Sequence, residues 1–423
     1  MRLTFFMLFA LPMAAWAQPP LTEDDAVRLG LARTERAALE RAALDAAEAD
    51  VRAAGVHPNP TLRYSREQLD GTPDSVEQAW MLEQAFDFSG RRGLHRDAAR
   101  RRVAAVEAGN ARDRQQLAAE IRRGFHAVLH RQAVVDATAT WVARFTRVEA
   151  VVERLARAGE ASGYDRRRLA RERQAAQALL ATERAALDLE AARLAALTGL
   201  APLPPLAGEL LPPPLPPLDA SLDGLDRHPQ LDALARRAEA ADLEARAAAR
   251  GAIPELTAGV GPKAVESAGV RESGVAFSLS LPLPVFDRQQ AGRARAAAEA
   301  RQVRAEHALL RARAEGELRG RHGQAERLRA TAIDYRRDAA AATPELLRVA
   351  ESAYQGGESS LLELLDAYRG ALDAETTVLE LEWRARDARI DYDLLAAPPA
   401  DAAPSAAALS APREPSIPGS PDR

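Results

Sequence analysis

The stretch that decides the fold is Tyr354-Gln-Gly-Gly-Glu-Ser-Ser-Leu-Leu-Glu-Leu-Leu-Asp366, which interrupts a helical pattern rich in alanine, arginine and leucine. Glycine ends helices because it adopts positive φ without a Cβ clash, and serine begins them by accepting hydrogen bonds from free N–H groups. The stretch therefore predicts the turn of a helical hairpin. A second such turn, Arg157-Ala-Gly-Glu-Ala-Ser-Gly-Tyr-Asp165, lies 198 residues upstream. We expect two halves, each folding back on itself at a tip.

Composition favours long helices over one large globular core. The chain has 423 residues, of which 28% are charged and 4% aromatic, and its net charge is −4. Single cores stop growing below this size, and abundant alanine, arginine, glutamate and leucine favour long helices. A net negative charge provides no basic field for nucleic acid. The sequence has no cysteine, which excludes disulfides, thiolate metal sites, a cysteine nucleophile and a bacterial lipid anchor.

The first 17 residues have the pattern of a secretory signal peptide. Arg2 precedes an apolar run from Leu3 to Ala14, and Ala15-Trp16-Ala17 supplies an A-x-A cleavage site before Gln18. The apolar run is shorter than the roughly 20 residues that a spanning helix needs, which argues against a membrane anchor. We therefore expect residues 1–17 to be removed and the mature chain to be exported.

The first half, residues 18–200, is predicted to contain a helix, a β-hairpin, a very long helix, a tip and a return helix. The hairpin covers about 61–88, where apolar and polar residues alternate around turn-forming residues. The tip covers about 158–165. In the long helix, apolar residues recur at the seven-residue spacing of a coiled-coil seam: Ile121, Val128, Val135 and Val142.

The second half, residues 226–397, is predicted to repeat the order of the first. A proline-rich connector over 201–225 separates the two halves. Polyproline geometry makes such a segment a semi-rigid spacer. A second alternating hairpin covers about 255–284, and a second tip covers about 354–361. The last residues, 398–423, are rich in proline, alanine and serine and are predicted to form a disordered tail.

The four predicted strands cannot close a barrel alone, because even small membrane barrels use about eight. Either they form a small sheet, or several chains contribute to one barrel. Their alternation of apolar and polar residues also suits a strand with lipid on one side and water on the other.

Several motifs, taken together with their order along the two halves of the chain, resemble the TolC family of outer-membrane efflux proteins. They are His57-Pro-Asn-Pro-Thr-Leu62, Leu82-Glu-Gln-Ala-Phe-Asp-Phe-Ser-Gly-Arg-Arg92, Leu281-Pro-Leu-Pro-Val-Phe-Asp287 and the Tyr354–Asp366 stretch. The resemblance covers about residues 20–397. The first two motifs are most similar to the heavy-metal branch, the outer-membrane subunits of cobalt–zinc–cadmium or copper–silver efflux.

The resemblance implies a mainly helical fold with a small β part and a homotrimer in the outer membrane of a Gram-negative bacterium. Three chains would form a 12-stranded barrel in outer-membrane lipid and a periplasmic tunnel of long helical hairpins. The tips would meet a periplasmic adaptor (a membrane fusion protein) and, through it, an inner-membrane pump, of RND type in the heavy-metal branch. The implied function is the exit duct of a tripartite efflux system.

The resemblance also assigns roles to residues at the tips. Glu363 and Asp366 are three residues apart on one helix face, where the family has acids that narrow the periplasmic entrance. Three copies would form an acidic ring that attracts cations; the alternative is two solvated acids on a helix surface. The expected adaptor-docking residues, which also suit simple helix capping, are Gly159, Glu160, Ser162, Gly357, Glu358 and Ser359.

Other motifs do not predict a chemical site. His126 and His130 lie four apart on one helix, but a metal usually needs three or four ligands and no third is near in sequence. Gly259-Val-Gly261-Pro-Lys263 lacks the spacing of a phosphate loop, and we find no nucleophile elbow or zinc-protease helix. We expect neither an enzyme nor a cofactor. The alternatives are a periplasmic coiled-coil adaptor or scaffold, and the duct of a type I secretion or drug efflux system.

Overall fold

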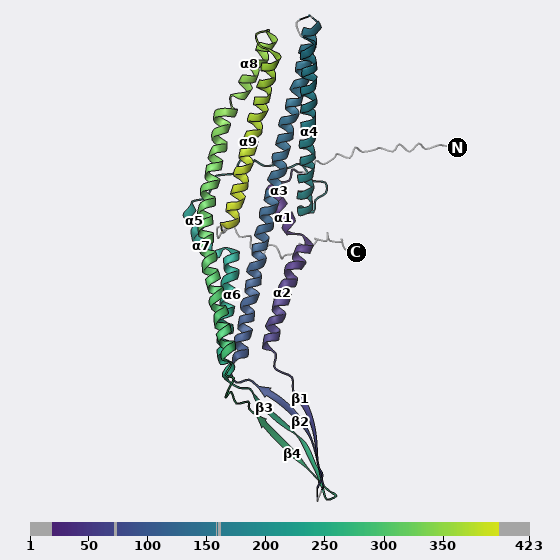
Figure 1. Cartoon of the computed structure of the whole chain (residues 1–423), viewed down its shortest axis with the longest axis vertical. Helices are drawn as coiled ribbons and strands as arrows, with labels where there is room; N and C mark the ends of the chain where they lie inside the picture. The colour runs from purple at the N-terminus through teal and green to yellow at the C-terminus, as the bar shows by residue number, and fades with distance from the viewer. Residues whose placement is uncertain (1–18, 72–73, 158, 160–161, 397–423) are drawn as a thin grey trace, which may run out of the picture. The chain divides into compact units, whose positions relative to one another are not determined.

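The computed structural model describes residues 19–71, 74–157, 159 and 162–396 (Figure 1). The predicted signal peptide and the predicted tail at 398–423 lie outside this range. Nine α-helices are described: α1 (Glu23–Leu31), α2 (Thr34–Gly55), α3 (Arg91–Arg157), α4 (Gly163–Thr198), α5 (Leu218–Gly224), α6 (Pro229–Ala249), α7 (Gln290–Tyr335), α8 (Thr343–Gln355) and α9 (Leu361–Leu395). The strands are β1 (Thr61–Leu69), β2 (Ser75–Phe86), β3 (Leu256–Ser267) and β4 (Val270–Ser280). The prediction of a mainly helical chain with a small β part is confirmed.

The chain divides into two compact units. One, here called the sheet unit, comprises the described residues of Thr34–Gln115 and Pro216–His322 with residues 392–396. The other, the tip unit, comprises residues 19–33 with the described residues of Gln116–Leu215 and Gly323–Asp391. None of the helices within the described ranges combines the length and the apolar character needed to cross a membrane.

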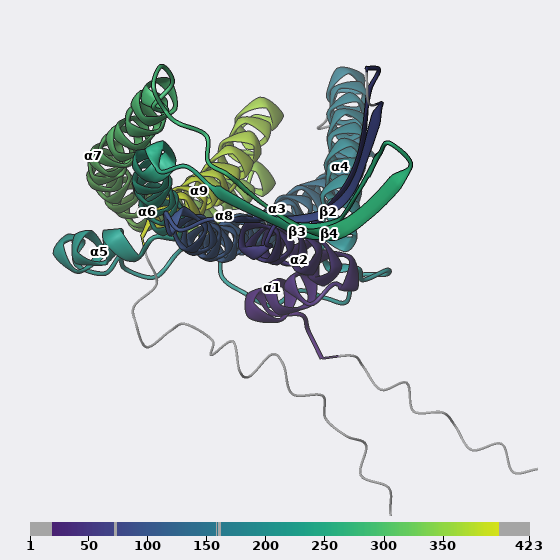
Figure 2. The same cartoon turned by 90° about the horizontal axis from the view of Figure 1, so that it is seen from below.

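The sheet unit contains one antiparallel sheet with the strand order β1-β2-β3-β4, so β1 and β4 are its edges. Figure 2 shows that the sheet is curved. Cross-strand neighbours share their side of the sheet: Tyr64 pairs with Trp80, and their rings lie 4.6 Å apart. On β3 and β4, Val260 pairs with Phe277 on that same side. The alternation in the sequence therefore produces two faces of different polarity.

Gly261 allows β2 and β3 to approach closely. Between these strands the pairing passes directly from Ala79↔Lys263 to Leu82↔Val260. A Cβ atom on Gly261 would lie 1.7 Å from the carbonyl oxygen of Trp80, which no side chain could tolerate. The following residue, Pro262, has no N–H to donate to a ladder. Glycine is therefore required here by the backbone of the neighbouring strand.

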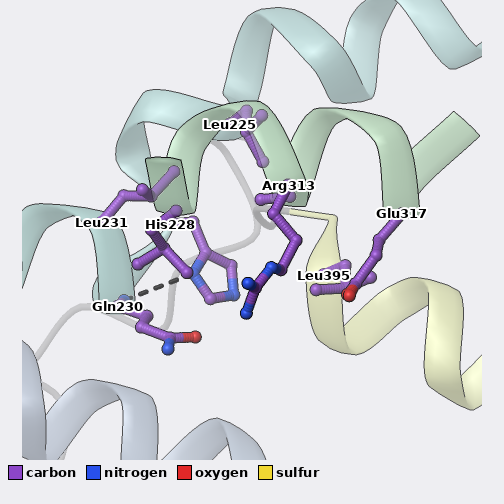
Figure 3. Close-up of a pocket in the computed structure, with 9 residues that line it drawn as sticks. Leu225, His228, Gln230, Leu231, Arg313, Glu317 and Leu395 are labelled. Carbon is purple, nitrogen blue, oxygen red and sulfur yellow. Dashed lines mark hydrogen bonds between the residues drawn. The ribbon is translucent and has the colours of Figure 1, made fainter. Parts of the chain in front are cut away.

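A cavity of about 50 Å³ in the sheet unit, shown in Figure 3, is explained by the structural role of His228. The Nδ1 atom of His228 accepts a hydrogen bond from the backbone of Gln230 and so caps α6, while Nε2 lies 3.1 Å from the carbonyl oxygen of Leu394. Burial lowers the pKa of His228. A cavity of this size holds only a few waters. The histidine therefore joins helix ends and does not form a ligand site.

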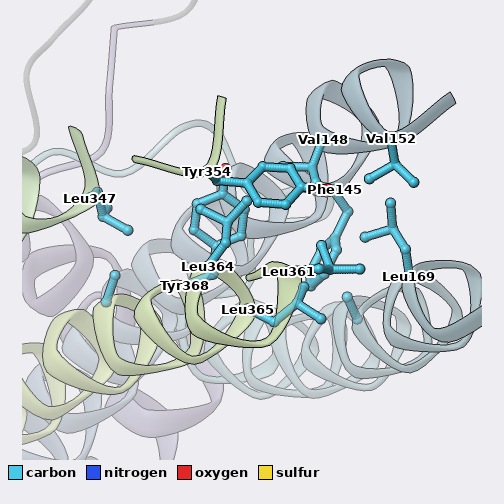
Figure 4. Packing of buried hydrophobic residues seen from close by; sticks show 12 residues of the cluster. Phe145, Val148, Val152, Leu169, Leu347, Tyr354, Leu361, Leu364, Leu365 and Tyr368 are labelled. Atoms are coloured by element: carbon cyan, nitrogen blue, oxygen red, sulfur yellow. The ribbon is translucent and has the colours of Figure 1, made fainter. Parts of the chain in front are cut away.

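The tip unit is held together by an apolar core drawn from α3, α4, α8 and α9 (Figure 4). Phe145 of α3 meets Tyr368 of α9 edge to face, with ring centroids 6.2 Å apart. Leu169 of α4 and Leu364 of α9 are each 1% exposed. Full burial of such side chains contributes about 1.5–3 kcal/mol each. The helices that lead into and out of both tips thus share one core.

A second core in the tip unit joins α1, α3 and α4, and it explains where the first helix breaks. We predicted a single helix before the first hairpin, but α1 ends at Leu31 and α2 starts at Thr34. Arg33, in the break, donates to the carbonyl oxygen of Ala196 at 2.6 Å. A Cβ atom at Gly30 would lie 2.3 Å from Ile121 Cδ1, so α1 packs tightly on α3. The break follows from these long-range contacts.

The proline-rich connector is ordered by arginines that donate to its backbone carbonyls. Proline removes N–H donors, so the carbonyls of such a segment lack ladder partners. Arg386 of α9 donates to the carbonyl oxygens of Glu209, Leu210 and Leu211, at 2.7–3.0 Å. Arg329 donates to the carbonyl oxygen of Pro212 at 2.9 Å. The connector predicted over 201–225 includes the short helix α5.

Candidate functional site

The first tip joins α3 to α4 with a glycine turn and a capping box. Gly159 has φ +82°, a left-handed conformation that glycine adopts without strain. Ser162 caps α4: its side chain accepts a hydrogen bond from the backbone N–H of Asp165 at 3.1 Å. The Asp165 carboxylate accepts in return from the Ser162 backbone N–H at 3.2 Å. The backbone N–H groups of Ser162 and Asp165 at the start of α4 are therefore both hydrogen-bonded to side chains three residues away.

The second tip ends α8 with a Schellman motif. Gly357, at φ +73°, donates to the carbonyl oxygen of Tyr354 at 3.2 Å, and Glu358 donates to that of Ala353 at 2.8 Å. This is the pair of backbone hydrogen bonds that closes a helix on a left-handed glycine. Both glycines predicted to turn the chain thus adopt the left-handed conformation.

The second tip also contains a capping box, and Glu363 is part of it. The Glu363 carboxylate accepts from the backbone N–H of Ser360 at 2.8 Å, and the Ser360 hydroxyl accepts from the Glu363 backbone N–H at 3.3 Å. Ser162 and Asp165 occupy the same positions in the first tip, at the offset of 198 residues. From the sequence we expected Glu363 to be either a gate residue or a solvated acid on the helix surface. The spacing Ser-x-x-Glu would have indicated this capping role as well.

Asp366 differs from Glu363 in its environment. Both side chains are exposed, but among the described residues Asp366 has no hydrogen-bond or ion-pair partner. One turn further along α9, Arg369 pairs with Glu172 of α4 at 2.5 Å. This pairing, outweighing the opposing effect of burial, lowers the pKa of Glu172. Of the two acids, Asp366 is the one whose charge is not engaged in holding the fold.

The expected docking residues are mostly exposed. Gly159, Ser162, Gly357 and Glu358 are exposed, Ser359 is half-buried, and Glu160 lies outside the described residues. The hydroxyl of Ser359 is buried without a hydrogen-bond partner in the described chain. Tyr354, immediately before the glycines, is buried, and burial with the nearby charge of Asp165 raises its pKa. The two tips therefore lie close enough for their groups to interact.

One face of the sheet is apolar and exposed across all four strands. The side chain of Phe277 is 81% exposed, and that of Leu279 is 72% exposed. Other exposed apolar residues share this face by their pairing in the sheet: Leu62, Tyr64, Trp80, Leu82, Phe86, Val260 and Val275. An exposed apolar patch of this extent marks a surface that is covered by a partner or by lipid.

The opposite face of the sheet is polar and contains ion pairs. Arg63 pairs with Glu83 at 3.1 Å, and Lys263 pairs with Glu77 at 2.5 Å. The edge strands β1 and β4 have no strand partner on their outer sides within the described chain. Unpaired edges are templates for pairing with another chain. The sheet is therefore incomplete in two respects, at its edges and on its apolar face.

The two histidines on α3 face different partners. His126 is 2% exposed, and its Nε2 atom lies 2.7 Å from Oε2 of Glu23. His130 stacks on the ring of Trp383, with centroids 5.9 Å apart. Burial lowers the pKa of both histidines. No cluster of three or more metal-ligating side chains occurs among the residues that the structure describes.

Solved structures of membrane proteins share this fold. A membrane protein from Pseudomonas aeruginosa matches with a TM-score of 0.73 and 20% identity, over 88% of this chain and 89% of that one. CusC, studied for its folding and transmembrane channel formation, matches with a TM-score of 0.72 and 17% identity, over 89% and 92%. The outer membrane protein VceC from Vibrio cholerae matches with a TM-score of 0.69 and 18% identity, over 88% and 94%.

These likenesses define the fold of this chain over nearly its whole described length. No protein-family model matches the sequence. No curated protein matches it either. The comparisons therefore establish a fold that this chain shares with solved membrane proteins, at identities of 20% or less in the three structures described above.

Proposed function

We propose that the chain is one subunit of an outer-membrane efflux channel, the exit duct of a tripartite system. The observation that carries the proposal is the sheet. It has a continuous exposed apolar face, a polar opposite face and two unpaired edges, in a chain that shares its fold with outer-membrane channels. In a scaffold protein surrounded by water, an exposed apolar face of this extent would be unfavourable. The first alternative, a periplasmic adaptor or scaffold, is therefore less well supported.

We propose a homotrimer on the resemblance to the TolC family, and the strand directions are compatible with it. In the order β1-β2-β3-β4, every neighbouring pair is antiparallel, so β4 also runs antiparallel to β1. The β4 edge of one copy can therefore pair with the β1 edge of the next without changing the pattern. Three copies of four strands form a closed 12-stranded barrel, which has no edges left. The apolar face then meets lipid, and the polar face lines the interior.

Fractionation and channel recording test the proposal together. The full-length protein is expected to remain in the outer-membrane fraction through high-salt and carbonate washes. Purified and reconstituted in planar bilayers, it is expected to conduct ions as a trimer. A monomer released by the washes would contradict the channel and would favour the scaffold.

We propose that the tips dock a periplasmic adaptor and that Asp366, with Glu363, narrows the entrance. The docking set is Gly159, Glu160, Ser162, Gly357, Glu358 and Ser359. At both turns, backbone groups of described residues are hydrogen-bonded within the chain, so the folding of these segments does not depend on a partner. An adaptor bound there would connect the duct to an inner-membrane pump, for which the motif resemblance favours the RND type.

The gate is tested best by charge-neutral substitutions that keep the capping box. Glutamine at position 363 still accepts the Ser360 N–H hydrogen bond, whereas alanine does not. We expect the double variant Glu363→Gln/Asp366→Asn to weaken block by multivalent cations in single-channel recordings. The matched control is Asp165→Asn, which alters the equivalent box of the first tip. Unchanged cation block in the double variant would contradict the gate.

We propose heavy-metal cations as the exported substrate, on the resemblance of His57-Pro-Asn-Pro60 and Phe88-Ser-Gly-Arg-Arg92 to the heavy-metal branch. Deleting the gene from its host is expected to lower tolerance of copper, silver, zinc, cobalt or cadmium. Lowered tolerance of hydrophobic drugs with unchanged metal tolerance would instead favour a drug efflux duct. A secretion defect alone would favour a type I duct.

A further inference from the structure

The apolar face of the sheet continues beyond the last paired residues at one end. The last pair of β2 is Phe86↔Leu256, and the last pair of β4 is Thr257↔Ser280. Because β2 and β4 are both antiparallel to β3, their carboxyl ends lie at the same end of the sheet. Five exposed apolar residues follow them there, here called the collar: Phe88, Leu281, Leu283, Val285 and Phe286.

The register aligns the collar with the apolar rows of the sheet. Pairing between β3 and β4 is constant from Ser267↔Val270 to Thr257↔Ser280. Its next step would bring Leu281 level with Leu256, which pairs with Phe86. The rings of Phe86 and Phe88 are stacked at 6.3 Å, so Phe88 extends the row on β2. By this register, Phe88 and Leu281 belong to the same face as the exposed residues of the sheet. Leu283, Val285 and Phe286 follow beyond the ladder at the same end.

The collar also corrects the predicted extent of the second hairpin. We expected Leu281 and Leu283 to lie within the strand, but β4 ends at Ser280. Pro282 and Pro284 cannot donate to a ladder, which ends the pairing while the apolar alternation continues. The backbone N–H of Val285 donates instead to the carbonyl oxygen of Leu283 at 2.9 Å. The residues are thus exposed without being part of a ladder.

The length of the apolar row on β4 indicates that the collar extends the apolar face. On β4, the exposed apolar row from Val275 to Leu279 spans only about 13 Å at roughly 3.3 Å per residue. Membrane barrels present an apolar band of about 25 Å. Counting on to Leu283 doubles the row to about 26 Å along the strand, which is roughly 20 Å of height for a strand tilted by about 35–45°. Without the collar, this edge strand would present too short an apolar surface.

Cationic residues follow the collar in both halves of the chain. Arg91 and Arg92 come after Phe88, and Arg288 and Arg293 come after Phe286. Arg91 is engaged with Asp87 and Glu255. Arg288 and Arg293 are exposed, and their guanidinium groups have no ion pair among the described residues. Apolar side chains followed by arginine suit the boundary between acyl chains and phosphates of a phospholipid leaflet.

We propose that the collar is a lipid-interface anchor, inserted at the headgroup boundary of the phospholipid leaflet on the side where α3 and α7 begin. This inference rests on the proposed membrane barrel and adds a specific surface and ligand class to it. Phe286 is 91% exposed and Leu283 is 73% exposed. Burial of such side chains in the interface favours one fixed depth of the barrel, and the arginines contact lipid phosphates.

Site-directed spin labelling tests the anchor, because the chain has no cysteine and every introduced cysteine is unique. Labels are placed singly by Phe88→Cys, Leu283→Cys and Phe286→Cys in the full chain. Phe277→Cys is the reference on the paired apolar face, and Ser65→Cys is the reference on the polar face. Each variant is reconstituted in phosphatidylcholine–phosphatidylglycerol vesicles. Collision rates with oxygen and with a water-soluble nickel complex are then measured.

The expected result is a severalfold higher ratio of oxygen to nickel collisions at the collar and at Phe277 than at Ser65. The anchor would be overturned if the collar labels collide with nickel as often as the label at Ser65, while the label at Phe277 collides mainly with oxygen. That result would leave the proposed barrel intact. Immobile labels that neither reagent reaches would also overturn it, because protein would then cover the collar. Nickel access at Phe277 would instead contradict the proposed barrel. Circular dichroism of each labelled variant confirms that it has folded.

Discussion

The tips and the sheet differ in how far one chain completes them. At both tips, glycine turns and capping boxes satisfy the ends of the helices with groups a few residues away. A shared core of α3, α4, α8 and α9 supports them. The sheet has ordered pairing but two open edges and an exposed apolar face. The chain itself completes the tips, whereas the sheet keeps unpaired edges and exposed apolar side chains within the described residues.

This difference separates residues that hold the fold from residues available for function. At the second tip, Glu363 serves the backbone, whereas Asp366 one turn later has no partner within the described part of the chain. In the sheet, the ion pairs Arg63–Glu83 and Lys263–Glu77 hold the polar face. The apolar residues on the exposed face of the sheet, in contrast, are not buried in the isolated subunit. Substitutions should therefore act through assembly in the sheet and through local stability at the tips.

The largest effect is expected from a charge on the apolar face. Tyr64→Arg places a cation where we propose lipid, which costs about 2–4 kcal/mol near the middle of a membrane barrel. The variant also removes the ring contact with Trp80. We expect little or no trimer in carbonate-washed outer membranes, measured on gels that preserve the trimer.

The matched control for this variant is the adjacent residue on the other face. Ser65→Arg introduces the same side chain on the same strand, opposite Ala79 on the polar face. We expect it to assemble at close to the level of the unmodified protein. Equal loss in both variants would mean that the two faces of the sheet are not distinguished by lipid.

A smaller effect is expected from Gly357→Val, because valine is strained at φ +73°. A left-handed conformation costs a non-glycine residue roughly 1–2 kcal/mol. We expect faster hydrogen exchange of the amides of Glu358 and Ser359, which donate to the carbonyl oxygen of Ala353. Trimer assembly should be unchanged, because the sheet is unaffected.

Gly357→Asn serves as the control, since asparagine tolerates the left-handed conformation. A Cβ atom at this position would meet nothing within 4 Å in the subunit. Asparagine should therefore retain hydrogen-exchange protection while still adding a side chain to the proposed docking surface. Lost protection in the asparagine variant would show that sterics at the tip, and not φ, limit the turn.

Local turn chemistry could be predicted from the sequence, whereas long-range contacts could not. The left-handed turns at Gly159 and Gly357 follow from glycine itself. The end of β4 at Ser280 follows from Pro282 and Pro284, although we predicted a longer strand. The contacts of Arg386 with the connector join residues more than 170 positions apart, which no local pattern encodes. Whether an exposed apolar face meets lipid is likewise decided by assembly.

A modest effect is expected from removing the capping hydroxyl at the second tip. Ser360→Ala loses the acceptor for the Glu363 backbone N–H, and such losses cost about 0.5–2 kcal/mol. Hydrogen exchange in the first turn of α9 should accelerate, whereas Glu363→Gln should change it little. If exchange accelerates as much in Glu363→Gln as in Ser360→Ala, the charge of Glu363 contributes as much to the turn as the hydroxyl of Ser360.

The smallest effect is expected from acidification, through His126 and Glu23 in the core beside α1. The Nδ1 atom of His126 is buried without a partner among the described residues. Burial lowers the pKa of His126 from the ordinary 6.5, with the charges of Arg386 and Arg122 adding to it against the hydrogen bond and charge of Glu23. Burial alone would raise the pKa of Glu23, but His126, Arg122 and Arg386 together hold it below the ordinary 4.5.

Both shifts destabilise the fold in acid. The unfolded chain binds more protons than the folded chain once the pH falls below about 6.5 for the histidine, and below about 4.5 for the carboxyl group. Stability from His126 is therefore fully present above pH 6.5 and lost as the pH falls through its lower folded value. We expect faster hydrogen exchange of the α1 amides at pH 5 than at pH 7, after correction for the intrinsic rate. His126→Gln keeps a donor for Glu23 but does not titrate, so an equal acceleration in this variant would assign the effect to other groups.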